Sequence, residues 1–179
     1  MAASFYVILC DTLPNLVRAW QHAFAAYPEV EVQRGDLLEV DADAYVSPAN
    51  SYGIMDGGID AVLSARFPHV EARVQAAIAA VSRLLPVGQA LVVETGDLDV
   101  PYLICAPTME VPSRVAHTSN AFRAMLALLS AVEQFNTENE DAISSIAIPG
   151  LCTGVGDMEP EVAALQMAQA YAEWRSHPT

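Results

Sequence analysis

The amino-acid sequence predicts an α/β fold, with a central mixed β-sheet that helices cover on both faces. Short apolar segments alternate with segments of helical spacing, from a strand at residues 5–10 to a helix at residues 160–174. This alternation favours parallel strands joined by crossover helices. The strands at residues 90–95 and 102–106 instead flank the turn Gly96-Asp97 with no helix between them. They are expected to pair antiparallel, which makes the sheet mixed.

The remaining elements follow in a regular order. Asp11 or Thr12 is expected to cap the first helix, because short polar side chains accept hydrogen bonds from the free N–H groups of a first turn. Pro68 divides two later helices, and Pro86-Val87-Gly88 ends the second of them. The other strands are expected at residues 30–33, 44–47 and 143–148. The first helix is expected to end at about residue 26, and further helices are expected at 58–66, at 69–84 and along the apolar stripe at 122–132.

The composition is that of a globular domain. The chain has 179 residues, 53% of them apolar, and a mean hydropathy of +0.29. We expect one domain that spans residues 1–179 and has a substantial core. No apolar run reaches the roughly 18–20 residues of a membrane span. No basic segment precedes an apolar one at the N-terminus, so a secretory signal is not expected.

The charge excludes some classes of partner. The formal net charge is −14, and all eight basic residues are arginines, because the sequence contains no lysine. Such a chain repels nucleic acid and anionic membranes, so neither is expected as a partner. An anionic small ligand is compatible with this charge, because a few backbone N–H groups can hold a phosphate locally.

The three cysteines indicate a reducing, cytoplasmic setting, because an odd number without a disulfide framework is typical of intracellular proteins. Cys10 and Cys105 lie in apolar strands and are expected to be buried. Cys152 lies in a loop, where it is a candidate nucleophile or redox-sensitive thiol, although no histidine is near it in the sequence. No spacing of cysteine and histidine predicts zinc. The histidines are expected at the surface or at helix caps, and they are His22, His69, His117 and His177.

The segment from Val46 to Leu63 has the composition of a phosphate-binding connection. A short apolar strand leads to Asn50, then to Gly57-Gly58, then to a helix with Asp60 in its first turn. Glycine lets the backbone approach a ligand, and the helix N-terminus adds a partial positive charge. Asn50 can bond a sugar hydroxyl as donor and acceptor. A plain strand–turn–helix connection without a ligand explains the same glycines and stays open here.

A second connection, at residues 147–158, has the same design. An apolar strand enters a loop with Gly150, Gly154 and Gly156, and a helix with Pro160 near its first turn follows. Two glycine-rich strand-to-helix loops can meet at the carboxyl edge of a sheet. Ligands of open α/β sheets bind at that edge.

Together, these segments resemble the macro domain family, whose members bind ADP-ribose. The first loop aligns without gaps to the family pattern Asn-Ala-Ala-Asn, a short spacer, a glycine run and Val-Asp. The second matches the family segment Pro-x-x-Ser-Thr-Gly-Val, and Gly35-Asp36-Leu37 is similar to the Gly-Asp-Ile after the second strand of the family. The resemblance spans nearly the whole chain and implies a three-layer α/β/α sandwich with a central mixed β-sheet.

The resemblance also implies a role for each matching residue. Asp36 would accept a hydrogen bond from the adenine amino group, Leu37 would add a backbone contact, and Asn50 would bond the distal ribose. In hydrolytic members the acid at the position of Asp60 orients or activates water, so Asn50 and Asp60 are the candidate catalytic residues. Turn capping by Asp36 and a helix-dipole role for Asp60 are the structural alternatives. The implied diphosphate contacts are Gly57, Gly58 and Ile59 on one side and Cys152, Thr153, Gly154, Val155 and Gly156 on the other.

Several positions depart from the family pattern. Ser47 replaces the first asparagine, and Ser64 stands where hydrolytic members often have histidine. Gly156 stands where the family usually carries an aromatic residue that stacks on the distal ribose. Tyr52 and Met158 are the candidates to fill that space.

The sequence therefore predicts a protein that binds ADP-ribose or an ADP-ribosylated protein or metabolite. A second interpretation adds hydrolysis of mono-ADP-ribosyl esters. Without lysine or a Glu-Glu pair, the Schiff-base and poly-ADP-ribose-degrading mechanisms of some relatives are excluded. The alternative is an acidic scaffold that kept the fold and lost the ligand. No resident cofactor or metal is predicted. Asp56 and Asp157 either face solvent or cap helices, or they hold a divalent cation against the diphosphate.

Overall fold

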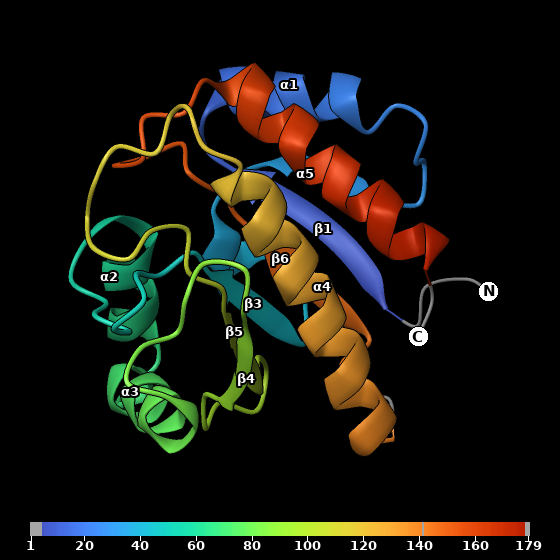
Figure 1. Ribbon diagram of the computed structural model, residues 1–179. Helices are drawn as coiled ribbons and strands as arrows, with labels where there is room; N and C mark the ends of the chain where they lie inside the picture. The colour runs from blue at the N-terminus through green and yellow to red at the C-terminus, as the bar shows by residue number, and fades with distance from the viewer. Residues whose placement is uncertain (1–4, 141, 178–179) are drawn as a thin grey trace.

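The computed structural model describes residues 5–140 and 142–177 (Figure 1). Its strands are β1 (Tyr6–Asp11), β2 (Glu31–Arg34), β3 (Ala44–Ser47), β4 (Leu91–Glu94), β5 (Tyr102–Cys105) and β6 (Ser145–Ile148). They form one sheet with the order β2-β1-β6-β3-β5-β4. Neighbouring strands are parallel except β4 and β5, which pair antiparallel. The predicted mixed sheet and its antiparallel pair are confirmed.

Five α-helices and one short 3-10 helix accompany this sheet in the described residues. They are α1 (Pro14–Ala23), η1 (Leu37–Glu39), α2 (Gly58–Arg66), α3 (Val70–Val81), α4 (Asn120–Glu138) and α5 (Pro160–Ser176). None of these described helices is long and apolar enough to cross a membrane.

The helices form a layer on each face of the sheet. On one face α5 packs between α1 and α4, and on the other α2 and α3 contact β3 and β4 (Figure 1). Alternate residues of a strand enter the two layers, as the pleat requires. In β1, Val7 and Leu9 join the core under α1, α4 and α5, whereas Ile8 and Cys10 join the core under α2 and α3. The predicted three-layer α/β/α sandwich is confirmed.

The start of α1 differs from the prediction. Neither Asp11 nor Thr12 caps this helix, which begins at Pro14 with Leu13 as the N-cap and no side-chain cap bond. Asp11 is the last residue of β1, and its carboxylate accepts hydrogen bonds from the N–H groups of Leu13 and Gly150, each over 3.0 Å. The prediction was wrong because the carboxylate is needed to join β1 to the loop after β6.

One buried amide connects α4 to the strand that follows it. Asn136, 2% exposed, donates from Nδ2 to the Ile143 carbonyl over 2.7 Å and accepts at Oδ1 from the Ile143 N–H over 2.9 Å. Both backbone groups of Ile143 are buried with it. The pair of bonds fixes where the chain enters β6, and therefore where β6 ends at the site.

We expect Asn136→Ala to lower the free energy of unfolding by about 2–4 kcal/mol, because two buried backbone groups lose their partners. Urea denaturation followed by circular dichroism measures this change. The control is Gln134→Ala on the exposed side of α4, where only a surface bond to Glu138 is lost and the change should stay within about 0.5 kcal/mol. Equal effects of the two substitutions would contradict a structural role for Asn136.

Candidate ligand-binding site

A cavity of about 390 Å³ lies at the carboxyl ends of the parallel strands, and its volume suits a small ligand. Its wall is built by the loops after β1, β2, β3, β5 and β6. The residues to which the family resemblance assigns a binding or catalytic role all line this one cavity. They are Asp36, Leu37, Asn50, Gly57, Gly58, Ile59, Asp60, Cys152, Thr153, Gly154, Val155 and Gly156.

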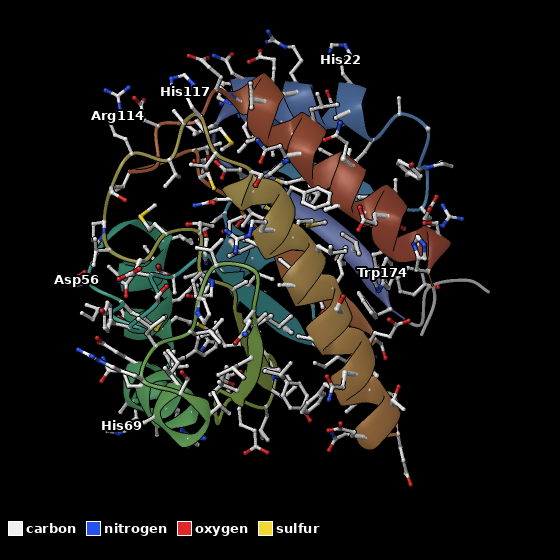
Figure 2. The ribbon with its side chains drawn as sticks, viewed as in Figure 1. His22, Asp56, His69, Arg114, His117 and Trp174 are labelled. Atoms are coloured by element: carbon white, nitrogen blue, oxygen red, sulfur yellow. The ribbon has the colours of Figure 1, made fainter. Side chains whose placement is uncertain are left out.

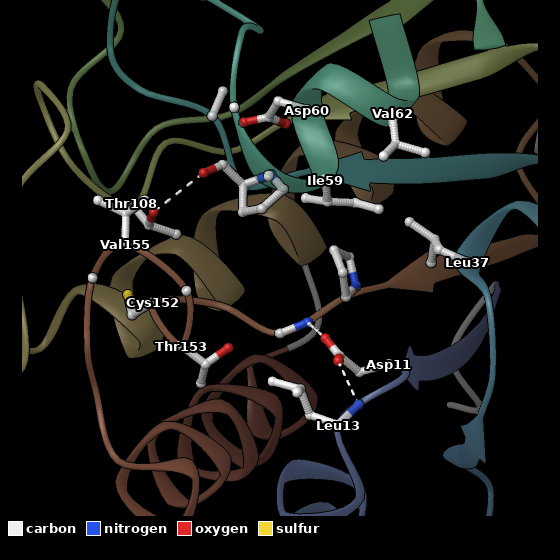
Figure 3. A pocket seen from close by; sticks show the side chains of 18 of the residues that line it. Asp11, Leu13, Leu37, Ile59, Asp60, Val62, Thr108, Cys152, Thr153 and Val155 are labelled. Carbon is white, nitrogen blue, oxygen red and sulfur yellow. Dashed lines mark hydrogen bonds between the residues drawn. The ribbon is translucent and has the colours of Figure 1, made fainter. Parts of the chain in front are cut away.

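Two loops face each other across the cavity. Figure 3 shows Ile59 and Asp60, at the start of α2, opposite the loop that carries Cys152, Thr153 and Val155. In the described part of the chain, the N–H groups of residues 58–60 and 153–155 donate to no protein acceptor. Added to the partial positive charge of a helix N-terminus, such free donors are suited to an anion.

The glycines in these loops serve two different purposes. At Gly57, Gly58 and Gly154 an added Cβ would meet no atom within 4 Å, so these residues leave the backbone open to the cavity. At Gly150 an added Cβ would collide with Thr153 Oγ1, and at Gly156 it would lie 2.6 Å from the Cys152 carbonyl oxygen. At Gly156 the obstacle is backbone, so a Cβ has no room there, whereas at Gly150 the obstacles are side-chain ends that would have to shift.

Asn50 lines the cavity, but much of its amide is already used. Nδ2 donates to the Ile54 carbonyl over 2.9 Å, and Oδ1 accepts from the N–H groups of Tyr52 and Ile54. The side chain therefore closes the turn at residues 50–54, which follows β3, as well as lining the cavity. One N–H of its amide is left for a ligand.

Asp60 is partly buried, and its Oδ1 accepts a hydrogen bond of 2.5 Å from the hydroxyl of Ser47, a fully buried residue of β3. Burial raises the pKa of the Asp60 carboxyl to about 6, and the negative charge of Asp56 adds to this rise. The Ser47 hydrogen bond acts in the opposite direction. A carboxyl with this pKa can exchange a proton near neutral pH.

The other end of the cavity contains Asp36 and Leu37. Asp36 is exposed, and one of its carboxylate oxygens accepts a hydrogen bond of 2.9 Å from the Leu38 N–H at the start of η1. The turn before it is held by the Gly35 N–H, which donates to the Asp11 carbonyl. Asp36 therefore caps η1 with one oxygen and leaves its second oxygen for another donor.

Comparison with known proteins identifies the family. A sequence profile described as Macro domain matches residues 46–167. The chain belongs to the macro domain family. An uncharacterized protein of Aquifex aeolicus is 36% identical over 141 residues, which is 79% of each chain.

Solved structures of macro domains show the same fold. The macrodomain of Mycobacterium tuberculosis DarG superposes with a TM-score of 0.63 and 26% identity, over 78% of this chain and 87% of that one. Thermosipho africanus DarTG, solved in complex with ADP-ribose, has a TM-score of 0.61 and 19% identity, over 78% of this chain and 37% of its own. At that identity, the second comparison supports the fold alone.

One departure of this macro domain from the family pattern has a packing reason. The carbonyl of Gly156 accepts a hydrogen bond from the Val115 N–H, and an added Cβ would meet Val115 Cγ2 at 2.8 Å. An aromatic side chain therefore has no room at this position. Neither Tyr52 nor Met158 lines the cavity, and Met158 is buried in the core. Neither candidate therefore fills the space.

The two loop carboxylates of the macro domain do not meet at the cavity. Asp56 lines it, whereas Asp157 is absent from its wall and forms an exposed ion pair with Arg114. Within the described residues, no group of three or more His, Cys, Asp or Glu side chains is placed to hold a metal ion. A cation held jointly by Asp56 and Asp157 is therefore not supported by this geometry.

Cys152 lines the cavity with little exposed surface, and burial raises the pKa of its thiol to about 12. The thiol is therefore protonated at neutral pH, which makes it a poor nucleophile. Figure 2 shows His22, His69 and His117 away from one another, and all three are exposed and absent from the cavity wall. Among the described residues, the cavity wall thus carries no histidine, and its Cys152 thiol is protonated.

Sequence reasoning missed several residues of the site. Asp11, Thr108, Met109 and Pro112 all line the cavity. The available signal was positional, because Asp11 ends a parallel strand and Thr108 closely follows another. Loops at the carboxyl end of every parallel strand reach the same edge of the sheet, including loops that carry no glycine motif.

The raised pKa of Asp60 predicts a pH-dependent effect on stability. Because the folded pKa, about 6, exceeds the ordinary value of 3.8 for an aspartate, the folded protein loses stability as Asp60 ionises between these values. We expect Asp60→Asn to unfold with a free energy equal to wild type near about pH 4 and higher by about 1–3 kcal/mol near about pH 8. Urea denaturation at both pH values measures this difference.

The matched control is Glu138→Gln, which removes a surface carboxylate far along α4 and should change stability by less than about 0.5 kcal/mol at either pH. A gain for Asp60→Asn that is the same at both pH values would contradict the assigned pKa.

Proposed function

We propose that this macro domain binds ADP-ribose in the cavity, with the diphosphate between the two glycine-rich loops. The observation that carries the proposal is the pair of free N–H sets, at residues 58–60 and 153–155, on opposite walls of one cavity. Backbone donors of this kind bind phosphate oxygens without a basic side chain. The cavity volume of about 390 Å³ and the family of the chain support a ligand of this size.

The two ends of the cavity suit the two ends of this ligand. Asp36 has a free carboxylate oxygen that can accept a hydrogen bond from the adenine amino group, and Leu37 lies beside it. Asn50 and Asp60 line the opposite part and can bond the hydroxyls of the distal ribose. A solved structure of the same fold, Thermosipho africanus DarTG, was determined in complex with ADP-ribose.

Isothermal titration calorimetry with ADP-ribose tests this proposal, with AMP and NAD as controls. We expect micromolar binding selective for ADP-ribose, weakened about tenfold by Asp36→Asn, since one hydrogen bond to the ligand is worth about 1.4 kcal/mol. In this variant the amide oxygen still accepts the Leu38 N–H, so η1 keeps its cap. The amide nitrogen then faces adenine as a second donor, which cannot pair with the amino group.

Absence of binding by every adenine nucleotide would contradict the proposal. It would favour the alternative of an acidic scaffold that kept the fold and lost the ligand. If the Asp36→Asn variant binds ADP-ribose as tightly as wild type does, only the proposed contact between Asp36 and adenine would be contradicted.

As a second function, we propose hydrolysis of a bond at the anomeric carbon of the distal ribose, with Asp60 as the general base. The observation that favours it is the pKa of about 6 at a carboxyl on the cavity wall. At neutral pH this group is ionised and can accept a proton from an attacking water. Ser47 would act as a positioning residue, because its hydroxyl bonds the same carboxylate.

A turnover assay on a mono-ADP-ribosylated peptide tests this second function. We expect the rate to rise with pH around about 6 and Asp60→Asn to lower it about 100-fold. The same variant should still bind ADP-ribose, because the amide keeps the shape of the side chain. Ser47→Ala removes the bond that lowers the pKa of Asp60, so the rise should move to higher pH. An unshifted profile in Ser47→Ala would contradict the positioning role, and a rate equal to wild type in Asp60→Asn would contradict the second function.

A further inference from the structure

The ribose end of the cavity opens between two neighbouring segments, residues 50–56 and 108–112. The Ser51 N–H donates to the Met109 carbonyl over 3.1 Å, and Asn50 forms a parallel bridge with Met109. Asn50 itself bonds the backbone of Ile54. These contacts hold the two segments side by side as one border of the cavity, which we name the ribose-side rim.

The rim presents apolar and acidic groups. Ile54, Met109 and Pro112 line the cavity there, and Ile54 is 43% exposed. Asp56 and Glu110 belong to the same two segments, and both are exposed. Among the described residues, neither carboxylate takes part in an ion pair. A group carried on the distal ribose would therefore meet apolar surface together with negative charge that no cation balances.

Among the described residues, no basic side chain lines the cavity to offset this charge. The charged residues on its wall are all acidic, namely Asp11, Asp36, Asp56 and Asp60. Arg114, which follows the rim by two residues in the sequence, already pairs with Asp157. Among the described residues that line the cavity, the free backbone N–H groups are the donors suited to an anion, so the site suits one diphosphate and repels further negative charge outside it.

We propose that the ADP-ribose taken by this site is attached to a polypeptide segment that carries basic and apolar residues beside the modified position. This inference rests on the proposed binding of ADP-ribose and adds the class of the attached group. Lys or Arg side chains of the segment pair with Asp56 and Glu110, while an apolar neighbour covers Ile54, Met109 and Pro112. A nucleic acid or a phosphorylated acceptor would bring phosphate charge against the same carboxylates.

The test uses four probes in which ADP-ribose is joined at its anomeric carbon by a non-hydrolysable bond. Three carry short peptides with Lys, Ser or Glu beside the attachment point, and the fourth carries a short oligonucleotide. Calorimetry gives the Kd of each probe. Dividing it by the Kd of free ADP-ribose for the same protein gives a ratio for each probe. The ratio isolates the contribution of the attached group from the contribution of the ADP-ribose.

We expect the Lys peptide to bind about tenfold more tightly than the Glu peptide at low ionic strength, since several exposed charge pairs contribute together. The oligonucleotide probe should bind less tightly than free ADP-ribose. The preference should shrink as salt is added, because exposed charges are screened. Equal ratios for the three peptides, or an oligonucleotide ratio as favourable as that of the Lys peptide, would overturn the inference and leave ADP-ribose binding intact.

Three variants locate the effect. Glu110→Gln should reduce the Lys-over-Glu preference about threefold without changing the Kd of free ADP-ribose, because Glu110 does not line the cavity. Asp56→Asn should reduce the preference similarly, judged by the ratio measured on that variant. Glu138→Gln makes the same charge change at the far end of α4, about 27 Å along the helix from its start, and should leave the preference unchanged.

A preference that falls equally in Glu138→Gln and Glu110→Gln would show that only the net charge matters and would overturn the role of the rim. Failure of free ADP-ribose and of all four probes to bind would overturn the proposed function, and this inference with it.

Discussion

The carboxylate of Asp11 is the contact on which the shape of the cavity depends. It ends β1, and one oxygen holds the chain entering α1 while the other holds the Gly150 N–H in the loop after β6. The Asp11 carbonyl accepts from Gly35, in the loop after β2. One residue thus ties together the carboxyl ends of three adjacent parallel strands. A Cβ at Gly150 would force the side chains of Asp11 and Leu16 to shift, since Asp11 Oδ2 and Leu16 Cδ2 lie in that space.

An acidic protein can present an anion site because the relevant potential is local. The chain carries a formal charge of −14, and the charged side chains on the cavity wall are all carboxylates. Backbone N–H dipoles at the start of α2 and in the loop at residues 153–155 lie much closer to a bound diphosphate than the surface charge does. In the proposed function, these dipoles hold the phosphate, whereas the longer-range surface charge affects which groups attached to the ligand are tolerated.

Asp60 shows how a site can reduce stability. Packing a carboxyl between β3 and α2 raises its pKa to about 6, so the ionised form at neutral pH weakens the fold. Ser47, at the position of the family's first asparagine, compensates part of this loss with a short hydrogen bond. Stability alone would favour a neutral residue at position 60. A carboxylate held there at a cost in folding free energy is typical of residues that act on a ligand.

The sequence by itself determined the α/β class, the antiparallel pair β4–β5 and the residues of two facing loops, because apolar periodicity and glycine-rich turns are local properties of a chain. Only the tertiary structure decided that Asp11 joins strands instead of capping α1, that Asp157 pairs with Arg114, and that position 156 has no room for a ring. It also brought Thr108 and Met109 to the cavity. These outcomes depend on which distant segments become neighbours, and long-range packing, unlike local periodicity, leaves no pattern in a single sequence.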